Sequence, residues 1–334
     1  MRRSVFTLVG VFLILALISV QCAFPGQQPQ QKEYKVAAIF PGVITDADYN
    51  TLGYVALEAV NKDFGLEIGY SEKVAVPDVE RVMREYVDQG FTVIWTHGGQ
   101  FFSQTINMAK EYPNVSFVAE SDAPAENPPP NLWVMDRNLH QPFYVLGYIA
   151  AKVSQTGKVG YIGGLTLPFS YAEVHAAEQG IEAAGGGVEL KAVWVGDFND
   201  PTKARELADA MIADGVDVIL GSLNLGMLGI FEAVKAAPHK VWVTAKYSDK
   251  SQFAPDNYIT SALYDYTKPF KDIVQNIMNG QPGGYYPMSF ETGHTVQLPL
   301  RNVPPGLEDE VRQILEDLKS GKISVVKDTT PVEK

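Results

Sequence analysis

Two stretches far apart in the chain repeat one pattern: residues 86–99 read YVDQGFTVIWTHGG, and residues 211–224 read MIADGVDVILGSLN. Each is typical of a helix end, a glycine C-cap and then a buried strand that ends in small residues. Such helix–strand units build parallel sheets that are covered by helices on both faces. Because each half of the chain holds one copy, we predict two similar α/β lobes rather than one long sheet.

The same alternation of strand and helix continues on both sides of these stretches. In the first half, we expect strands at residues 35–40, 73–76, 92–96, 115–119 and 132–135, and helices at residues 52–64, 79–87 and 101–112. In the second half, we expect helices at residues 144–153, 171–184, 201–213 and 227–236, and strands at residues 158–162, 190–195, 216–220 and 241–245. A strand at residues 258–263, a helix at 269–278, a short strand near Phe290 and a helix at 307–318 complete the pattern.

The chain continues with several more helices and strands after residue 258, although the second lobe is already complete by its own repeat. These extra elements indicate that the chain crosses back between the lobes. Two lobes with such crossings form a hinged ligand trap. The predicted fold class is therefore α/β, with two doubly wound parallel-sheet lobes joined by a multi-crossover hinge. We expect a signal peptide at 1–22, a flexible tether at 23–33, an N-terminal lobe made of 34–138 plus 262–288, and a C-terminal lobe made of 139–261 plus 289–320.

Length and composition agree with this organisation. The chain has 334 residues, and at roughly 150 residues per domain this length favours two domains. It carries 27 basic and 39 acidic side chains, and the resulting net charge of −12 disfavours a nucleic-acid partner. One cysteine excludes an intramolecular disulfide framework, a four-cysteine zinc site and a CxxC redox pair.

The N-terminus resembles a bacterial lipoprotein signal. Arg2 and Arg3 precede an apolar run over residues 5–20, which is marginal in length for a membrane span. The run ends at Cys22, although Gln21 stands where such signals have a small residue. The resemblance implies that Cys22 becomes a lipidated N-terminus on the extracytoplasmic face of the cell membrane, with an uncleaved anchor helix or simple secretion as alternatives.

Motifs of the common enzyme classes are missing from the sequence. It contains no GxSxG, no GxxxxGK[ST], no HExxH and no paired Cys/His set. The five histidines have no ligand-like spacing, so we expect no metal, no cofactor and no catalysis. His97 stands apart because it follows a buried strand and precedes Gly98, where open α/β sheets bind ligands.

Aromatic residues gather near the carboxyl ends of the expected strands. Tyr49 and Asn50 follow the first strand in a loop that enters a helix. The other aromatics at such positions are Phe101, Phe169, Trp194 and Phe198. Stacking on aromatic rings holds flat ligands, and Asn and Asp add directional hydrogen bonds. The pattern favours a binding cleft, with core or rim packing as the alternative for each residue.

An ordered series of segments resembles the basic membrane protein family of ABC-transporter substrate-binding lipoproteins, which have the type I periplasmic-binding-protein fold. Residues 46–50, DADYN, stand where that family has D-x-S-F-N. Further matching segments are AKEYPNVSF at 109–117, GYIAA at 147–151, GKVGYIGG at 157–164, GDFNDP at 196–201 and GVDVI at 215–219. The resemblance covers about residues 34–290.

The resemblance implies a protein that captures purine nucleosides or related purines for an ABC permease, and we expect it to be a monomer. By position, Tyr49 matches an aromatic that stacks on the base, and Asn50 matches a polar contact. Phe198 and Phe169 match aromatics of the other lobe, and Asp122 lies near an acidic position of the cleft.

Two departures from the family pattern bear on the ligand. Where nucleoside-binding members carry an Asp, this chain reads Lys246, and where they carry a Lys, it reads Tyr264. Losing two sugar-side charges removes hydrogen bonds worth roughly 1.5–3 kcal/mol each. The pattern looks more like the branch that binds free nucleobases such as adenine, so we predict a nucleobase.

A nucleoside-binding protein and a ligand sensor for a membrane signalling partner remain alternatives. An enzyme that uses Asp122, His97 and Asp249 as acid–base groups is a further one. The complete set of expected ligand-binding residues is Asp46, Tyr49, Asn50, His97, Phe101, Asp122, Phe169, Trp194, Phe198, Lys246, Tyr247, Asp249, Tyr264 and Asp265.

Overall fold

The structure is a computed structural model that describes residues 33–332. The expected signal peptide, most of the expected tether and the lipidation site Cys22 lie outside the described residues, so these expectations stay predictions. Within residues 33–332, no helix is long and apolar enough to cross a membrane.

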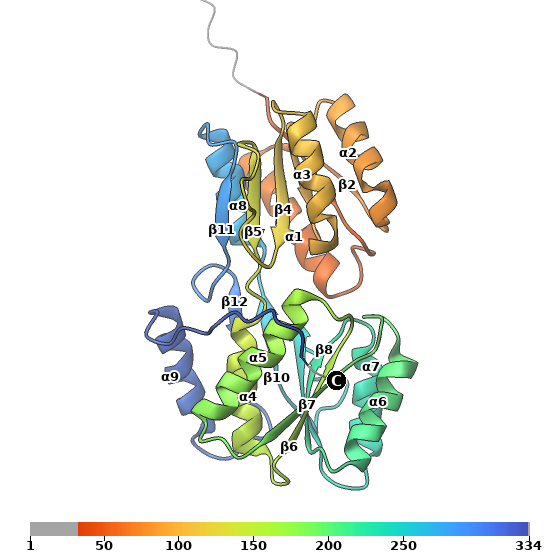
Figure 1. Cartoon of the computed structure of the whole chain (residues 1–334), viewed down its shortest axis with the longest axis vertical. Coiled ribbons are helices and arrows are strands. Elements are labelled where there is room, and N and C mark those ends of the chain that lie inside the picture. The colour runs from red at the N-terminus through yellow and green to blue at the C-terminus, as the bar shows by residue number, and fades with distance from the viewer. Residues whose placement is uncertain (1–32, 333–334) are drawn as a thin grey trace, which may run out of the picture. The chain divides into compact units, whose positions relative to one another are not determined.

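The first sheet consists of six parallel strands in the order β11-β5-β4-β3-β1-β2 (Figure 1). Its strands are β1 (Lys35–Ile39), β2 (Glu67–Ser71), β3 (Val93–Thr96), β4 (Ser116–Ser121), β5 (Leu132–Asp136) and β11 (Gly284–Pro287). Helices α1 (Tyr49–Phe64) and α8 (Thr267–Met278) pack together on one face of this sheet. Helices α2 (Val79–Asp88) and α3 (Phe102–Glu111) cover the other face, preceded by the short 3₁₀ turns η1 (Val76–Asp78) and η2 (Gly99–Phe101). We call this sheet and its helices the N-lobe.

The second sheet has the order β12-β10-β9-β8-β6-β7, in which only β12 is antiparallel to its neighbour. Its strands are β6 (Lys158–Gly163), β7 (Glu189–Trp194), β8 (Val218–Ser222), β9 (Trp242–Tyr247), β10 (Tyr258–Tyr264) and β12 (His294–Val296). One face is covered by α4 (Gln141–Val153), α5 (Pro168–Ala183) and α9 (Leu307–Lys319), the other by α6 (Pro201–Ala213) and α7 (Met227–Ala236). We call this sheet and its helices the C-lobe.

The two sheets have the same strand order, which explains the repeated pattern in the sequence. The repeated stretches form β3 and β8, and these two strands occupy the same place, the fourth, in the spatial order of their sheets. Gly90 and Gly215 precede these strands with φ values of 84° and 92°, a left-handed conformation that glycine adopts without strain. The prediction of two doubly wound parallel-sheet lobes is confirmed.

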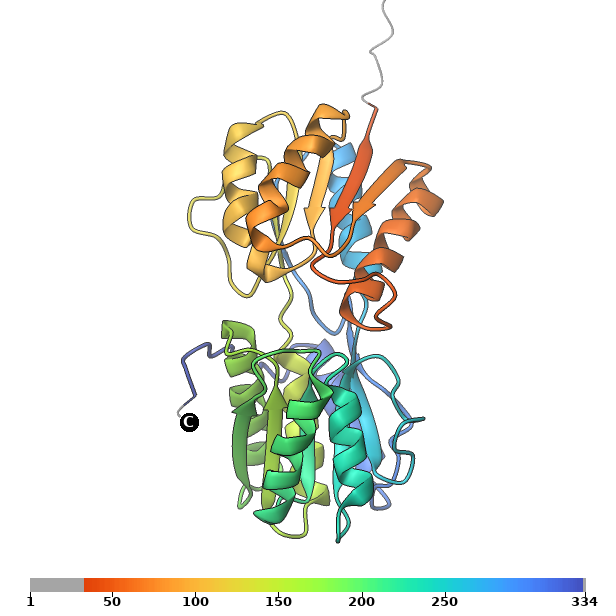
Figure 2. The same cartoon turned by 90° about the vertical axis from the view of Figure 1, so that its right-hand side faces the viewer.

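The chain passes between the lobes after β5, after β10 and after β11, as Figure 2 shows from the side. After α9, residues 323–332 form an extended segment that runs back along α5 (Figure 1). We call residues 323–332 the C-terminal strap.

The sequence pattern did not place three of the strands correctly, and all three lie at an edge of a sheet: β2, β11 and β12. The expected strand at 73–76 is wrong, because β2 lies at Glu67–Ser71 and the 3₁₀ turn η1 begins at Val76. In place of the one short strand expected near Phe290, the structure has two, β11 before it and β12 after it, and Phe290 itself lies in the turn between them. Edge strands expose one side to water and lack the continuous apolar run that marks a central parallel strand.

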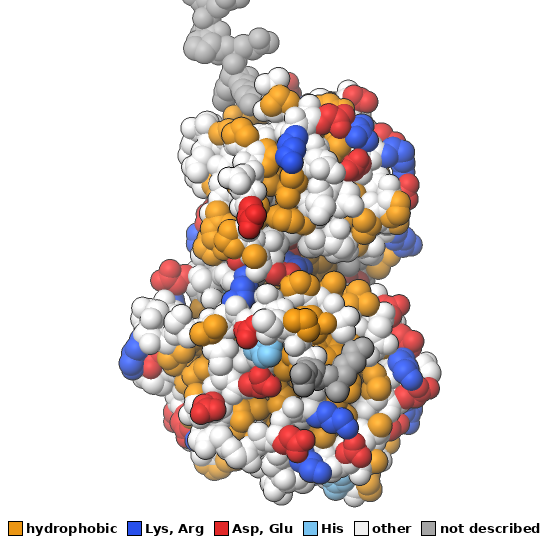
Figure 3. Space-filling model, in the orientation of Figure 1, with side chains coloured by type: hydrophobic (Ala, Val, Ile, Leu, Met, Phe, Trp, Pro, Cys, Tyr) orange, Lys and Arg blue, Asp and Glu red, His pale blue; other side chains and the backbone are white. Residues whose placement is uncertain are grey.

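Acidic and basic side chains are interspersed on the face drawn in Figure 3. On that face, no extended basic surface of the kind that binds a nucleic-acid backbone is visible among the described residues.

Candidate functional site

A cavity of about 760 Å³ lies at the carboxyl ends of the strands of both sheets. The N-lobe supplies segments that follow β1, β3, β4 and β5, and the C-lobe supplies segments that follow β6, β7 and β8 together with Tyr247, the last residue of β9. Open α/β sheets bind their ligands at these ends. Most of the lining is apolar, and the aromatic residues in it are Tyr49, Phe102, Phe169, Phe198 and Tyr247.

Tyr49 stands at the start of α1 and anchors the N-lobe side of the cavity. Its ring stacks on His97, with the ring centroids 3.9 Å apart and the planes inclined by 21°. Its hydroxyl donates a hydrogen bond to Glu120, a fully buried residue of β4. His97 lies behind Tyr49, outside the cavity lining, and its Nδ1 is 2.5 Å from Glu120 while its Nε2 is 2.7 Å from the Tyr49 carbonyl oxygen. The Tyr49 ring is therefore held in one orientation.

Glu120 is the acceptor at the centre of this network. Burial by itself would raise its pKa, but His97, Arg137 and the Tyr49 hydroxyl together hold the pKa below its ordinary value. Burial and the Glu120 charge raise the pKa of Tyr49, so the phenol stays a hydrogen-bond donor. The sequence analysis missed Glu120, although a carboxylate inside a buried strand was a signal, because such charges need partners.

An ion pair between Asp122 and Arg137 forms the charged part of the N-lobe lining. Arg137 Nη2 lies 2.8 and 3.0 Å from the two Asp122 carboxylate oxygens. The guanidinium lies 5.2 Å from the ring centroid of Phe169, a C-lobe residue, so it faces an aromatic ring across the cavity. Arg137 Nε is buried without a hydrogen-bond partner among the described residues. Asp122 was expected here, whereas Arg137 was not.

The C-lobe presents two phenylalanine rings that are nearly parallel. The ring centroids of Phe169 and Phe198 are 6.2 Å apart, and their planes differ by 18°. Phe169 lies in the first turn of α5, where Pro168 begins the helix, and Phe198 lies in the loop after β7. Both were expected to face the ligand, and both line the cavity.

Lys246 does not line the cavity, because a buried ion pair holds it beneath the C-lobe aromatics. Its ammonium group pairs with Glu173 of α5, and neither side chain is accessible to solvent beyond 1%. The ammonium lies 4.9 Å from the ring centroid of Phe169 and 4.8 Å from that of Tyr247. Burial lowers the pKa of Lys246, and the Glu173 charge opposes this effect. Lys246 thus supports two cavity rings from behind.

A second buried ion pair connects the two lobes. Asp48, next to Tyr49 in the N-lobe, pairs with Lys250 of the loop after β9, and both side chains are less than 10% exposed. Ser248 Oγ donates to the same carboxylate at 3.0 Å, and Lys250 Nζ also donates to the Lys246 carbonyl at 3.1 Å. Burial raises the pKa of Asp48, and Lys250 opposes the shift. The pair was not found in the sequence because its members are 202 positions apart.

Tyr49 and Asn50 were expected in a loop, but they are the first two residues of α1, and Asp46 and Asn50 shape the turn that leads into this helix. The Asn50 amide donates to Asp46 at 2.6 Å and accepts from the Gly42 backbone N–H at 3.1 Å. Asp46 accepts the backbone N–H groups of Asn50 and Thr51 at the start of α1. Asn50 lines the cavity, and Asp46 lies behind it.

Five more of the expected residues lie outside the cavity lining. Phe101 is fully buried in the core under α2 and α3, and its neighbour Phe102 lines the cavity instead. Trp194 donates to Ser170 at 3.0 Å, and Tyr264 donates to the Leu139 carbonyl at 2.8 Å in the segment between the lobes.

The last two of the five, Asp249 and Asp265, are exposed. They accept backbone N–H groups from Ser251 and Thr267 in local turns.

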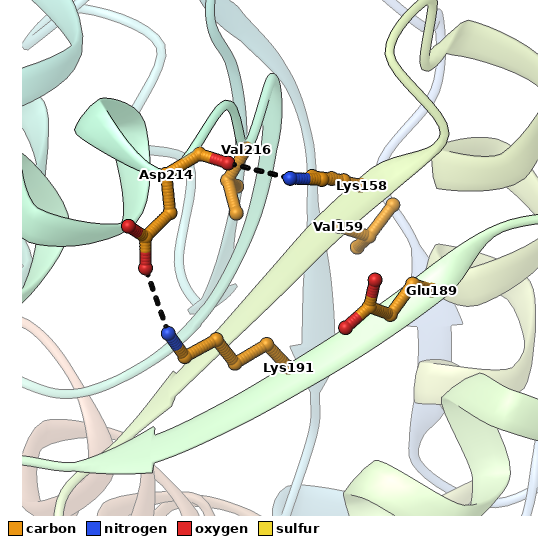
Figure 4. Close-up of a pocket in the computed structure, with 6 residues that line it drawn as sticks. All are labelled: Lys158, Val159, Glu189, Lys191, Asp214 and Val216. Atoms are coloured by element: carbon orange, nitrogen blue, oxygen red, sulfur yellow. Dashed lines mark hydrogen bonds and ion pairs between the residues drawn. The ribbon is translucent and has the colours of Figure 1, made fainter.

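A second, smaller pocket of about 170 Å³ lies at the opposite end of the C-lobe sheet (Figure 4). Lys158 and Glu189 begin strands β6 and β7, so this pocket is at the amino ends of the strands. Lys191 pairs with the Asp214 carboxylate at 2.9 Å, and Lys158 donates to the Asp214 carbonyl at 2.8 Å (Figure 4). Both lysines of this pocket are held by Asp214, and the cavity between the lobes, which is larger, is the candidate site.

Two lobes of identical strand order with a cavity at the facing carboxyl ends of their sheets define the periplasmic-binding-protein fold. The family model described as ABC transporter substrate-binding protein, PnrA-like (Bmp), matches residues 33–324. The chain belongs to this family, as the sequence resemblance predicted. Members are extracytoplasmic proteins without catalytic activity that deliver a small-molecule ligand to a membrane permease, which also confirms the prediction that the chain is not an enzyme.

Curated relatives cover most of the chain at low identity. Basic membrane protein A2 of Borrelia garinii subsp. bavariensis is 27% identical over 289 residues, which are 85% of this chain and 82% of that protein. Basic membrane protein B of Borreliella burgdorferi is 28% identical over 92% of this chain and 91% of its own length. The putative ABC transporter glucose-binding protein TsgA13 of Haloferax volcanii is 25% identical over 90% of this chain and 76% of its length.

Solved structures share the fold. An ABC transporter system solute-binding protein from Conexibacter woesei superposes with a TM-score of 0.68 and 23% identity, covering 88% of this chain and 99% of that chain. A transcriptional activator of the comK gene from Bacillus halodurans superposes with a TM-score of 0.69 and 22% identity, covering 86% of this chain and 96% of that chain.

Proposed function

We propose that this substrate-binding protein captures a purine base by aromatic stacking and delivers it to an ABC permease. The observation that carries the proposal is the aromatic cavity: five rings from both lobes line a space of about 760 Å³. Stacking of a base on an aromatic side chain is worth roughly 1–3 kcal/mol and suits the flat face of any purine.

Polar groups around these rings can read the edge of a base. Asp122 and Arg137 stand on the N-lobe side together with Gln100, and Asn199 and Asn224 stand on the C-lobe side. Carboxylate and amide groups offer acceptors and donors that match ring nitrogens and exocyclic groups of a purine.

The preference for a base over a nucleoside rests on the groups that would hold a ribose. In the family pattern, the positions of Lys246 and Tyr264 carry sugar-side charges. In this chain, Lys246 forms an ion pair with Glu173, and the Tyr264 hydroxyl donates its hydrogen bond to the Leu139 carbonyl. A ribose placed there would meet no free charged group from either position, so its hydroxyls would lose charge-assisted hydrogen bonds.

Ligand capture is proposed to proceed by closure of the lobes about the three crossings. The proposed rigid units are residues 34–138 plus 265–288 and residues 139–264 plus 289–320, because β10 pairs with C-lobe strands as far as Tyr264, three residues beyond the boundary expected at 261. A ligand that contacts rings of both lobes binds the closed form better than the open form, and this difference shifts the population toward closure. The protein is proposed to act as a monomer, which light scattering on the eluted peak of a sizing column would test.

Isothermal titration of the chain from residue 33 onward, stripped of endogenous ligand by unfolding and refolding, tests the ligand assignment. Adenine, guanine, hypoxanthine, xanthine, their nucleosides and glucose form one series, since one relative is named a glucose-binding protein. We expect a base to bind at least ten times more tightly than its nucleoside. Equal or tighter nucleoside binding would overturn the preference for a base, and absence of purine binding would overturn the purine assignment.

Lipid anchoring through Cys22 is proposed from the basic start and the apolar run that ends at the only cysteine of the chain. A Cys22→Ser variant should leave the membrane fraction and lose the mass of the acyl groups. Membrane association that persists unchanged in this variant would favour a retained anchor helix.

A further inference from the structure

The C-terminal strap, residues 323–332, is attached to the C-lobe along α5. The side-chain amide of Gln179 in α5 makes two hydrogen bonds to the backbone of Val326. Its oxygen accepts from the Val326 N–H at 2.9 Å, and its nitrogen donates to the Val326 carbonyl at 3.0 Å. His175, one turn earlier, lies 3.1 Å from the Thr330 carbonyl. Ile323 and Val325 pack against the core. The strap thus follows α5 toward the end that carries Phe169.

The same strap is attached to the N-lobe by one charged side chain. Lys327 Nζ lies 2.5 and 2.7 Å from the carboxylate oxygens of Asp136, the last residue of β5. The Asp136 side chain is 3% exposed, and it also accepts the Tyr285 hydroxyl at 2.6 Å. A charge-assisted contact to a buried carboxylate is a strong anchor. The strap therefore contacts both lobes.

Between these anchors, the strap reaches the candidate site. Thr329 lines the cavity together with Leu167, Pro168 and Phe169 at the start of α5. Part of the cavity wall therefore comes from the end of the chain, outside both sheets and beyond the 33–324 range that the family model matches.

We propose that the C-terminal strap is a gate of the ligand site: it closes the cavity beside Phe169 and slows the exit of the ligand. This proposal rests on the proposed function, because the ligand that the gate retains is taken to be a purine bound in this cavity. The strap contacts both lobes as they lie in this structure, so moving the lobes apart would break one of its anchors. Ligand binding that holds the lobes together therefore also holds the strap in place. Coupling of this kind is reciprocal and typically changes binding about 5–150-fold.

A thiol placed inside the cavity measures the gate without any ligand. Cys22 is the only cysteine, so the full chain with Cys22→Ser and Ser121→Cys holds one thiol, at a position that lines the cavity. The rate of its reaction with a bulky maleimide reports access to the cavity. Lys327→Met removes the N-lobe anchor, and Lys322→Met is the matched control, because Lys322 is an exposed lysine that pairs with Asp317 of α9, outside the strap.

We expect Lys327→Met to label at least about fivefold faster than the control. Gln179→Ala, which removes the α5 anchor and leaves Asp136 paired, should also label faster, so that a folding defect of one variant does not decide the test. Equal labelling rates in both anchor variants and the control overturn the gate.

Adenine as a probe separates this proposal from the proposed function. In the protein without the thiol, stopped-flow fluorescence should give an adenine dissociation rate at least about fivefold higher for Lys327→Met than for Lys322→Met. Faster labelling in the anchor variants without binding of any purine would retain the gate and overturn the purine assignment. Purine binding with equal labelling rates and equal dissociation rates would retain the assignment and overturn the gate.

Discussion

Replacing Lys246 by Met tests whether this lysine supports the site from behind or contacts the ligand. The substitution keeps the length of the side chain and removes its charge. Glu173 would then lie fully buried with two hydroxyl donors, Tyr161 at 2.8 Å and Ser222 at 2.7 Å, and no cation.

The expected cost follows from the burial of this pair. Removing one member of a buried ion pair costs about 3–5 kcal/mol, because the remaining charge is left uncompensated. A folded protein is stable by only about 5–15 kcal/mol, so Lys246→Met should remove a large fraction of the free energy of unfolding. Adding Glu173→Gln removes the charge and keeps an oxygen that accepts from Tyr161 and Ser222. The double variant should therefore recover about half of the loss or more.

Urea unfolding followed by tryptophan fluorescence measures these free energies, and an unchanged slope against urea identifies a change in stability alone. Lys203→Met is the control, because its pair with Glu206 is exposed and contributes at most about 1 kcal/mol. Adenine titration of the double variant gives the second readout, and its binding free energy should stay within about 1 kcal/mol of that of the unmodified protein.

Two results would refute this reasoning. Equal stability of Lys246→Met and the Lys203→Met control would mean that Glu173 does not depend on the lysine. A double variant of recovered stability that no longer binds adenine would mean that Lys246 contacts the ligand directly.

Three further predictions concern the cavity, the contact between the lobes and the response to acid. Tyr49→Ala should weaken adenine binding by roughly 1–3 kcal/mol through the loss of a stacking ring, whereas Tyr49→Phe keeps the ring and should lose less; equal losses in titration would contradict stacking. Lys250→Met leaves Asp48 buried without its cation in the closed form, so small-angle scattering of the unliganded protein should report a larger radius of gyration, and an unchanged radius would contradict a contact that favours closure. Burial lowers the pKa of His140 from 6.5 to about 4 and that of His294 to about 3, so the unfolded chain binds more protons below pH 6.5. Stability should thus be present above pH 6.5 and fall as the pH drops toward 4, by roughly 3 kcal/mol from His140; a urea midpoint that falls equally in His140→Gln would exclude this cause.

Much of the fold follows from local pattern in the sequence. Helices α6 and α7 begin and end at the residues that the periodicity predicted, and the repeated stretch marks the equivalent strands β3 and β8. A 3.6-residue period and a buried β-branched run are properties of neighbouring residues, so the sequence contains them directly. The edge strands β2, β11 and β12 depend on neighbouring strands for their pairing, and their local sequence carries a weaker signal.

The candidate site divides in the same way. The sequence placed aromatic residues near the carboxyl ends of strands, but only the tertiary structure decided that Phe102, rather than its neighbour Phe101, lines the cavity. Lys246 and Glu173 are 73 positions apart, so the sequence could not indicate that this lysine is buried against a carboxylate instead of facing a ligand. The sequence by itself determined the elements and the kinds of side chain at their ends. Which side chains face the cavity, and which charges meet, was decided by tertiary packing, because burial and pairing depend on distances between residues that lie far apart along the chain.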